Sequence, residues 1–229
     1  MKQQTHGYLS GLCILLLVLQ TTGDVVAHAE TLTSIALPAP QTSGGKSLQQ
    51  LLQERRSVRE YKNTQLALSQ LGQLLWAAQG ITHPQGLRTA PSAGALYPLE
   101  IYFVANNVET LDPGVYHYLP QRHQLSLHRE GDFSKGLARA AYAQSWLRQA
   151  AVVFVISANY EKTTVKYSKR GERYVHIEVG HAAENLFLQA EALDLGTVVV
   201  GAFYDDEVTD ALHLPADVSP LLLIPVGGR

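Results

Sequence analysis

One segment near the C-terminus, residues 173–194, predicts a long helix that is buried on more than one side. Its apolar side chains recur with helical spacing, at Val179, Ala182, Ala183, Leu186, Phe187 and Ala190. Further apolar residues fall on other faces of the same helix, at Ile177, Leu188, Ala192 and Leu193. A helix that is apolar on several sides is covered on several sides. In a chain of 229 residues, we expect the second cover to be a partner subunit.

The rest of the chain alternates helical and extended patterns around this helix. We expect helices at residues 47–56, 69–79, 133–148 and 205–212, and strands at residues 99–104, 115–118, 124–128, 151–157, 197–203 and 221–226. The strand at residues 151–157 is continuously apolar, which is typical of burial on both faces. Only the C-terminal part has a regular strand–helix–strand order. The pattern predicts an α+β fold, with one sheet flanked by helices.

The N-terminus has the pattern of an export signal. Lys2 precedes a short apolar run at residues 12–19, and Ala27-His28-Ala29 follows as a small-residue cleavage site. The run is too short to span a bilayer, so we expect no stable membrane anchor and an exported, periplasmic protein. The alternative is an N-terminal anchor or a buried strand. The predicted organisation is a signal peptide at residues 1–29, an extended arm at 30–46 and one domain at 47–229.

Composition excludes several classes of protein. The net charge of −2 provides no basic face, so no nucleic-acid partner is expected. The only cysteine, Cys13, lies in the predicted signal peptide, which leaves the mature chain without a disulfide or a thiolate nucleophile. His123 and His128 are five residues apart and point to opposite sides of a strand, so they do not gather with His117. No metal site is predicted.

A cluster of cations lies at the end of the first predicted helix. Arg55, Arg56 and Arg59 fall close together, with Ser57 among them. Arginine binds phosphate through paired, charge-assisted hydrogen bonds that contribute about 1.5–3 kcal/mol each, and a serine hydroxyl adds a donor. The cluster therefore predicts a phosphate site. The alternative is a solvated basic turn, since cations also stabilise the C-terminal end of a helix.

A stretch of small residues, residues 88–98, leads into the first predicted strand of the domain. The absence of bulky side chains between Pro91 and Ala95 lets backbone amides approach a flat ligand closely. A tight structural turn is the alternative. Ser92 also suggests the nucleophile of a serine hydrolase, although the first glycine of a nucleophile elbow is missing.

Five segments, taken in order, resemble one known family. They are RRSxRxY from Arg55, APSAGALYPLE from Ala90, KYxxRGxRY from Lys166 with the following ExGHAAxN, GAFxD from Gly201, and a terminal PVG. Together they resemble the nitroreductase superfamily, and more narrowly its SagB/ThcOx-type dehydrogenase branch. The resemblance covers residues 47–229.

The resemblance implies a nitroreductase-like sheet with a long central helix, an intertwined homodimer, and FMN held at the dimer interface. The residues that match FMN phosphate and ribityl contacts are Arg55, Arg56, Ser57 and Arg59, with Arg229 near the phosphate. The residues that match contacts to the isoalloxazine ring are Pro91, Ser92, Ala93, Gly94 and Leu96, with Gly201 and Ala202 near the ring.

The Lys166–Tyr167 pair matches a pair that does acid/base work in azoline-oxidising members of the branch. The resemblance thus implies ping-pong transfer of a hydride between a small organic substrate and FMN, followed by an electron acceptor. Because NAD(P)H is scarce outside the cytoplasm, we expect a dehydrogenase or oxidase rather than a nitroreductase. The alternatives are a non-catalytic binding protein on the same fold and a serine hydrolase using Ser92.

Glu184 departs from the family, which usually has glutamine at this position. The departure places a carboxylate on the predicted core helix. The apolar leader is a second difference, since it is unlike a cytoplasmic peptide-modifying enzyme.

Overall fold

The computed structural model describes residues 34–229; residues 1–33, with the predicted signal peptide and its cleavage site at Ala29, lie outside the described part. Seven strands form one sheet in the order β1-β4-β3-β2-β5-β7-β6, and each neighbouring pair is antiparallel. The strands are β1 (Ser34–Ala36), β2 (Leu99–Ala105), β3 (Gly114–Leu119), β4 (Gln124–Glu130), β5 (Val152–Ala158), β6 (Leu195–Thr197) and β7 (Ser219–Gly228). The helices are α1 (Leu48–Glu54), α2 (Leu68–Gln79), the short 3-10 turn η1 (Ala93–Ala95), α3 (Ser134–Ala140), α4 (Trp146–Gln149), α5 (Glu161–Tyr167), α6 (Arg170–Ala192) and α7 (Asp205–Leu212).

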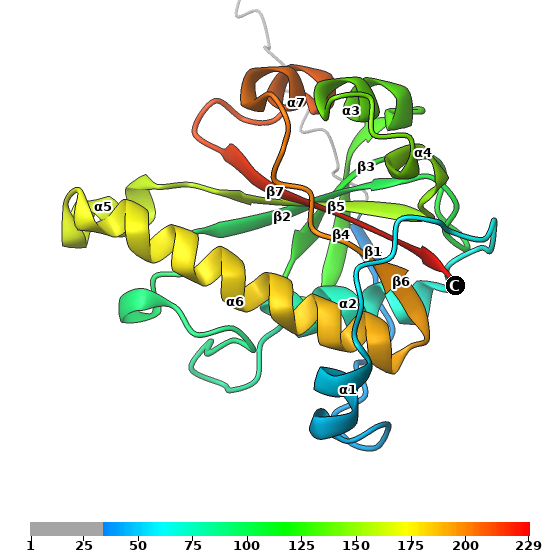
Figure 1. Cartoon of the computed structure of the whole chain (residues 1–229). Coiled ribbons are helices and arrows are strands. Elements are labelled where there is room, and N and C mark those ends of the chain that lie inside the picture. The colour runs from blue at the N-terminus through cyan, green and yellow to red at the C-terminus, as the bar shows by residue number, and fades with distance from the viewer. Residues whose placement is uncertain (1–33) are drawn as a thin grey trace, which may run out of the picture. The chain divides into compact units, whose positions relative to one another are not determined.

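The sheet separates two apolar cores, because its central strands are buried on both faces (Figure 1). In β2, Ile101 and Phe103 belong to the core that includes α2 and α6, whereas Tyr102 and Val104 belong to the core that includes α3, α4 and α7. Every residue of β5 is buried, as its continuous apolar run predicts. The α+β fold, a nitroreductase-like sheet flanked by helices, is confirmed.

The predicted long helix is confirmed as α6, which begins at Arg170. One side packs against the sheet, and the opposite side is exposed in the described chain, with Ile177 48% exposed. The predicted helix at residues 133–148 is instead two short helices, α3 and α4. Tyr142 and Ala143 between them have φ angles of 55° and 57°, and a right-handed helix cannot continue through that conformation.

The predicted strand at residues 197–203 is wrong in its extent. β6 ends at Thr197, and beyond it an isolated bridge joins Val200 to Leu223 of β7. The intervening residue Val198 lies opposite Pro225, which has no N–H to donate to the ladder. Thr197 Oγ1 donates a hydrogen bond to the Pro225 carbonyl oxygen instead, at 2.9 Å. The chain then leaves the sheet edge as an exposed segment.

The strand–helix–strand order predicted for the C-terminal part is present, but its first two strands are not neighbours in the sheet. β5 and β6 flank the helical segment in sequence, but β7 lies between them in the sheet and is antiparallel to both. β7 has ten residues, most of them buried, whereas β6 has three. The longer strand therefore occupies the inner position, and β6 forms the sheet edge.

The predicted extended arm contains a strand and leads into a well-capped helix. β1 pairs with β4 and adds an edge to the sheet. Ser47 caps α1 in a reciprocal capping box with Gln50. The apolar residues of α1 are not covered, and Leu48 and Leu52 are 56% and 55% exposed. Within residues 34–229, no helix is both long enough and apolar enough to cross a membrane.

Gly171, near the beginning of α6, packs directly against α5. A Cβ built on it would lie 2.9 Å from Thr164 Cα and 3.0 Å from the carbonyl carbon of Thr163. Because these are backbone atoms, they cannot move aside as a flexible side chain does. We expect Gly171→Ala to lower the free energy of unfolding by about 1–3 kcal/mol, measured by urea denaturation.

Gly136→Ala in α3 is the control for this prediction. A Cβ at Gly136 would meet Ala211 Cβ at an ordinary 3.6 Å. The change should be neutral, or stabilising by up to about 1 kcal/mol, because alanine favours a helix. A Gly171→Ala protein as stable as the wild type would show that α5 and α6 are not in close contact.

Candidate functional site

The small-residue loop between α2 and β2 is closed by hydrogen bonds. The Tyr97 N–H donates to Ser92 Oγ at 2.9 Å, and the Arg88 N–H donates to Tyr97 Oη at 3.2 Å. The Thr89 N–H donates to the Gly80 carbonyl at 3.0 Å, which fastens the loop to the end of α2. The segment therefore has the defined conformation of a tight turn, and this conformation leaves small residues at its tip.

The backbone at the tip of this loop is strained. Gly94, Ala95 and Tyr97 have φ angles of 64°, 55° and 47°. The left-handed region suits glycine but is unfavourable for residues that carry a Cβ. Ser168, between α5 and α6, has a φ of 49° and is a further such residue. Strain of this kind costs about 1–3 kcal/mol per residue and gathers at functional sites.

The Lys166–Tyr167 pair lies directly over the loop tip. Both residues are at the end of α5. A Cβ built on Gly94 would lie 2.8 Å from Tyr167 Oη and 2.9 Å from Lys166 Nζ. The absence of a side chain at Gly94 is what lets the pair approach. The structure thus brings the predicted acid/base pair and the predicted ring-contact loop together within one chain.

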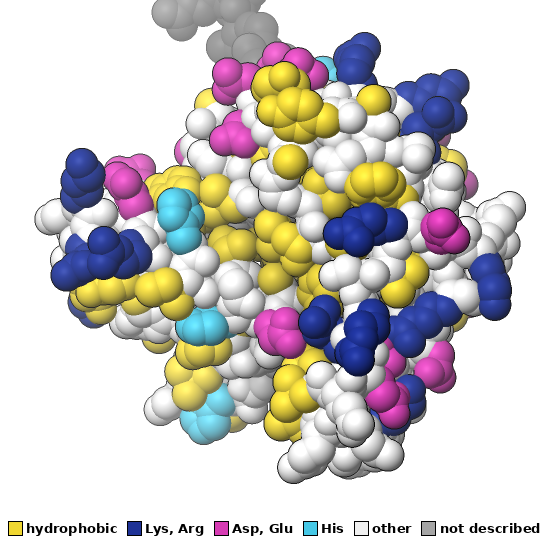
Figure 2. All heavy atoms as spheres, in the orientation of Figure 1, with side chains coloured by type: hydrophobic (Ala, Val, Ile, Leu, Met, Phe, Trp, Pro, Cys, Tyr) yellow, Lys and Arg dark blue, Asp and Glu magenta, His cyan; other side chains and the backbone are white. Residues whose placement is uncertain are grey.

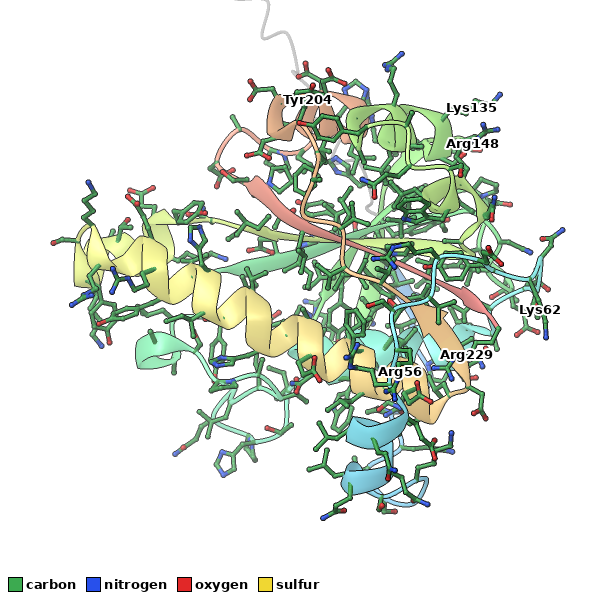
Figure 3. The ribbon with its side chains drawn as sticks, in the orientation of Figure 1. Arg56, Lys62, Lys135, Arg148, Tyr204 and Arg229 are labelled. Atoms are coloured by element: carbon green, nitrogen blue, oxygen red, sulfur yellow. The ribbon has the colours of Figure 1, made fainter. Side chains whose placement is uncertain are left out.

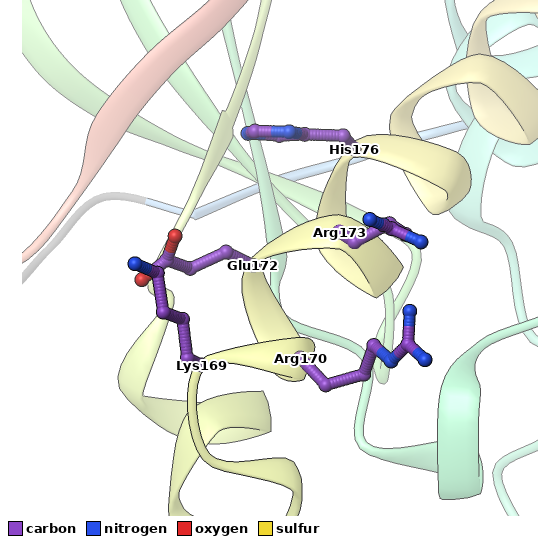
Figure 4. A pocket seen from close by; sticks show the side chains of 5 residues that line it. All are labelled: Lys169, Arg170, Glu172, Arg173 and His176. Atoms are coloured by element: carbon purple, nitrogen blue, oxygen red, sulfur yellow. The ribbon is translucent and has the colours of Figure 1, made fainter.

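A basic hollow adjoins the pair at the beginning of α6. The hollow has a volume of about 480 Å³ and is lined by Lys169, Arg170, Glu172, Arg173 and His176. Figure 4 shows Arg170 and Arg173 pointing to one side of the helix, and Lys169 and Glu172 pointing to the other. Three of the five lining residues are cations, so this hollow favours anionic groups.

The cation cluster and the C-terminus meet at β6. The Val58 N–H donates to the Thr197 carbonyl at 2.8 Å, so the segment that follows Arg56 runs beside this strand. A Cβ built on Gly196 would lie 2.8 Å from Val58 Cγ1 and 3.5 Å from Arg229 Cγ. Figure 2 shows Lys and Arg side chains gathered on this part of the surface, and Figure 3 places Arg56 and Arg229 there.

The side chains of the cluster differ in how free they are to bind an anion. The Arg55 guanidinium lies over the Phe187 ring, 5.4 Å from its centroid. Arg56 Nη1 donates to the carbonyls of Gln53 and Arg55 at 2.8 and 2.7 Å. The rest of the Arg56 guanidinium is available, and Ser57 and Arg59 are exposed.

Arg229 is held by a buried carboxylate. Its Nη1 donates to Glu191 Oε1 at 3.0 Å, its Nη2 contacts Glu191 Oε2, and its Nε donates to the Leu195 carbonyl at 3.0 Å. The hydrogen bonds to Glu191 raise the pKa of Arg229. A guanidinium has five N–H donors, so some remain for a further ligand. FMN joins a phosphate to a planar ring, and a cationic end with a small-residue loop fits both parts.

Gly201 and Ala202 lie elsewhere, on the exposed segment between β6 and α7. The Ala202 carbonyl accepts a hydrogen bond from Gln144 Nε2 at 3.1 Å. The nearest atom to a Cβ built on Gly201 would be Leu222 Cδ1, at 4.0 Å. None of the hydrogen bonds within residues 34–229 connects this segment to the Pro91–Leu96 loop. The described chain therefore shows no contact between Gly201 or Ala202 and the other predicted ring contacts, which lie in the Pro91–Leu96 loop.

The geometry around Ser92 does not resemble a hydrolase site. Ser92 Oγ accepts the Tyr97 N–H, and no histidine of the described chain hydrogen-bonds to it. The three histidines considered as metal ligands have separate partners. These contacts are His117 with Glu100, His123 with Tyr118 and His128 with the His213 carbonyl. Among residues 34–229, no group of three or more potential ligands is placed to hold a metal ion.

Sequence reasoning missed a buried polar cluster behind the loop, formed by Gln79, Arg88 and Glu178. Glu178 is 2% exposed, and Arg88 Nη1 donates to Gln79 Oε1 at 2.8 Å. Burial raises the pKa of Glu178, while Ser92, Arg88 and Gln79 oppose the shift. The signal was present, because Glu178 interrupts the apolar stripe of the helix. The sequence places a second carboxylate, Glu184, on this core helix, but Glu184 is exposed. It follows Glu178 by six residues, and at about 100° per residue the two side chains point in different directions around the helix.

Comparisons with known proteins match nearly all of the predicted domain. A family model described as the nitroreductase family matches residues 52–228. A protein of Methanocaldococcus jannaschii that is provisionally named a nitroreductase is 48% identical over 182 residues, covering 80% of this chain and 91% of that protein. The microcin B17-processing protein McbC of Escherichia coli is 32% identical over 152 residues, 59% of this chain and 52% of that protein. The crystal structure of a provisionally named nitroreductase from Ralstonia eutropha JMP134 superposes with a TM-score of 0.75 at 30% identity, covering 86% and 89% of the two chains.

Glu178 is expected to make the stability of the protein depend on pH. Because its pKa is raised above the ordinary 4.5, the folded state keeps a proton that the unfolded state has lost. The stabilisation that comes from the higher proton affinity of the folded state is therefore complete below pH 4.5. It is lost as the pH rises through the raised pKa of Glu178, so the free energy of unfolding falls. Glu178→Gln cannot ionise, so we expect it to lack this decline and to exceed the wild type in stability at alkaline pH.

Urea denaturation from about pH 5 to about pH 9 measures this difference. Glu207→Gln is the control, because Glu207 is an exposed residue in the first turn of α7. Parallel stability curves for the wild type and Glu178→Gln would contradict a raised pKa.

Proposed function

The chain belongs to the nitroreductase family, and on this premise we propose that it is an FMN-dependent oxidoreductase of the SagB/ThcOx type. The observation that carries the proposal is the contact between Gly94 and the Lys166–Tyr167 pair. It puts acid/base groups at the tip of a loop whose small residues suit a flat ring. When bound there, FMN would supply a two-electron acceptor.

Each part of the chain then has a separate task. Arg56 and Arg229 hold the phosphate end with the N–H groups that are not already in use. The Pro91–Leu96 loop offers backbone and small side chains to one edge of the ring. Lys166 or Tyr167 removes a proton from the substrate, which requires a base within hydrogen-bonding reach of that proton.

The direction of the reaction is part of this proposal. Oxidation of a small organic substrate needs a group that accepts a proton beside the ring, and the Lys166–Tyr167 pair is such a group. The similarity to McbC, which is named as a processing protein, supports the same branch of the family. The proposed reaction is thus a dehydrogenase or oxidase reaction, with a separate electron acceptor completing the cycle.

The proposed assembly is a homodimer. Leu48, Leu52 and Ile177 are large apolar residues of α1 and α6, and about half of each side chain is exposed. A second copy on these helices would cover them. It would also let the Gly201–Ala202 segment of one copy approach the Pro91–Leu96 loop of the other.

The proposed location is the periplasm, on the strength of the pattern at residues 1–29. FMN would then bind after export of the chain. A mature N-terminus at Glu30, read by mass spectrometry of protein from the natural host, would support this location, whereas an intact Met1 would oppose it.

The cofactor is tested by the visible absorbance of the purified protein and by analysis of what it releases on denaturation. We expect a yellow protein that releases FMN. Arg56→Gln should weaken FMN binding by about ten- to a hundredfold, because a charge-assisted hydrogen bond contributes about 1.5–3 kcal/mol, and should leave riboflavin binding unchanged. A colourless protein that also fails to bind added FMN would remove the enzyme proposal and leave the fold alone.

The acid/base pair is tested with Lys166→Ala. Menadione serves as the oxidised form of a small organic substrate, so the reaction is followed in reverse: a base that removes a proton from the substrate would return one to the quinone. The holoprotein is reduced with dithionite, and its reoxidation by menadione is followed in an anaerobic stopped-flow instrument. We expect the variant to keep its FMN and to react at least about a hundredfold more slowly than the wild type, since general acid/base catalysis contributes about 10²–10⁴-fold. Lys135→Ala, at an exposed lysine of α3, is the control. An unchanged rate in the Lys166→Ala protein would exclude this lysine from the chemistry.

A further inference from the structure

The buried polar cluster of Gln79, Arg88 and Glu178 has no task in the function proposed so far. Its members come from three separate elements: the end of α2, the start of the loop, and the middle of α6. Gln79 and Glu178 are almost completely buried, at 0% and 2% exposed. Apolar residues would fill the same space without a desolvation cost. The cluster therefore calls for a reason other than packing.

Three polar atoms in this cluster have no hydrogen-bond partner: Gln79 Nε2, Arg88 Nε and Glu178 Oε1. They are three of the seven buried side-chain atoms in this condition within residues 34–229. A buried polar atom left unpaired costs about 1–3 kcal/mol, and such atoms are uncommon in folded proteins. Two of the three are donors and one is an acceptor.

The cluster is connected to both ends of the strained loop. Ser92 favours the ionised form of the Glu178 carboxyl and so opposes the rise of its pKa, and Ser92 Oγ accepts the Tyr97 N–H at 2.9 Å. On the other side, the Arg88 guanidinium lies 4.6 Å from the centroid of the Tyr97 ring. Tyr97 is one of the residues with a positive φ. A strained backbone persists only where its surroundings fix it, and these contacts do so from behind.

We propose that Glu178 is a positioning residue for the flavin ring, which holds the Pro91–Leu96 loop in its strained conformation through Ser92, with Arg88 and Gln79 as supports. This inference rests on the proposed function, because it takes the front of the loop as the ring contact. Glu178 acts on the ring only through the loop. The affinity for the ring then depends on Glu178, while the affinity for the phosphate depends on Arg56.

Glutamine is expected to preserve the function of Glu178. Burial raises the pKa of Glu178 and so favours its neutral form, which a glutamine imitates in shape and in hydrogen bonding. Leucine, in contrast, keeps the packing and loses the contact to Ser92. A buried polar group replaced by an apolar one of similar size often leaves stability unchanged. The two substitutions thus separate positioning of the loop from packing of the core.

The experiment titrates the full-length apoprotein with riboflavin and with FMN, followed by quenching of flavin fluorescence. Glu178→Leu should lower the affinity for both ligands by about tenfold or more. The affinities of Glu178→Gln should stay within about threefold of those of the wild type. Glu178→Leu should also alter the visible circular dichroism of the bound flavin, because the ring is held differently. Arg56→Gln is the matched contrast, since it should weaken FMN and not riboflavin. Thermal unfolding of each variant establishes that it is folded.

Several outcomes decide the matter. A folded Glu178→Leu protein that binds riboflavin as tightly as the wild type overturns the positioning by Glu178 and leaves the proposed function standing. A Glu178→Gln protein as weak as the leucine variant also overturns it, because the rescue fails. If the wild type binds neither flavin, the proposed function itself falls. If the leucine variant does not fold, Glu178→Met carries the same comparison with a more adaptable side chain.

Discussion

The packing of α6 against α2 and the sheet sets the geometry of the whole candidate site. A helix of 23 residues is about 35 Å long, and this one touches the site at three levels. Its beginning carries α5, and with it Lys166 and Tyr167, through the close contact at Gly171. Its middle supplies Glu178 behind the small-residue loop, and its end supplies Glu191, which holds Arg229. A displacement of the helix would therefore disturb the acid/base pair, the loop and the anion-binding arginine together.

The two buried carboxylates on this helix serve different purposes. Glu191 forms a two-pronged pair with Arg229, and Lys46 Nζ lies 3.9 Å from Glu191 Oε1. A buried ion pair contributes little net stability, because desolvation offsets the attraction, but it fixes a guanidinium in one place. Glu178 is less completely paired, and its pKa is raised by burial. The helix thus gives up stability at two positions, and both positions adjoin the candidate site.

The local sequence pattern was enough to predict the elements whose buried residues follow a regular spacing. The stripe of α6, the continuous apolar run of β5 and the β3–β4 hairpin all follow from spacing within one segment. The end of β6 could not be predicted in this way, because Pro225 matters only once β7 lies beside it. The motifs named the loop and the Lys166–Tyr167 pair with roles, whereas Glu178, the first residue of ExGHAAxN, was given none. Its significance arises from contacts among residues distant in sequence, which no single motif contains.

Under the proposed function, this arrangement would separate binding of the cofactor from recognition of the substrate. The arginines that suit a phosphate are held at the end of α6, whereas the acid/base pair and the basic hollow are at its beginning. The strained loop between them is fastened from behind by Tyr97, Arg88 and the polar cluster, and its front is left to small residues. Side chains around the hollow are therefore able to change without disturbing either the phosphate contacts or the loop. If the proposed function holds, this geometry would allow the substrate to vary on one fold while the flavin site stays the same.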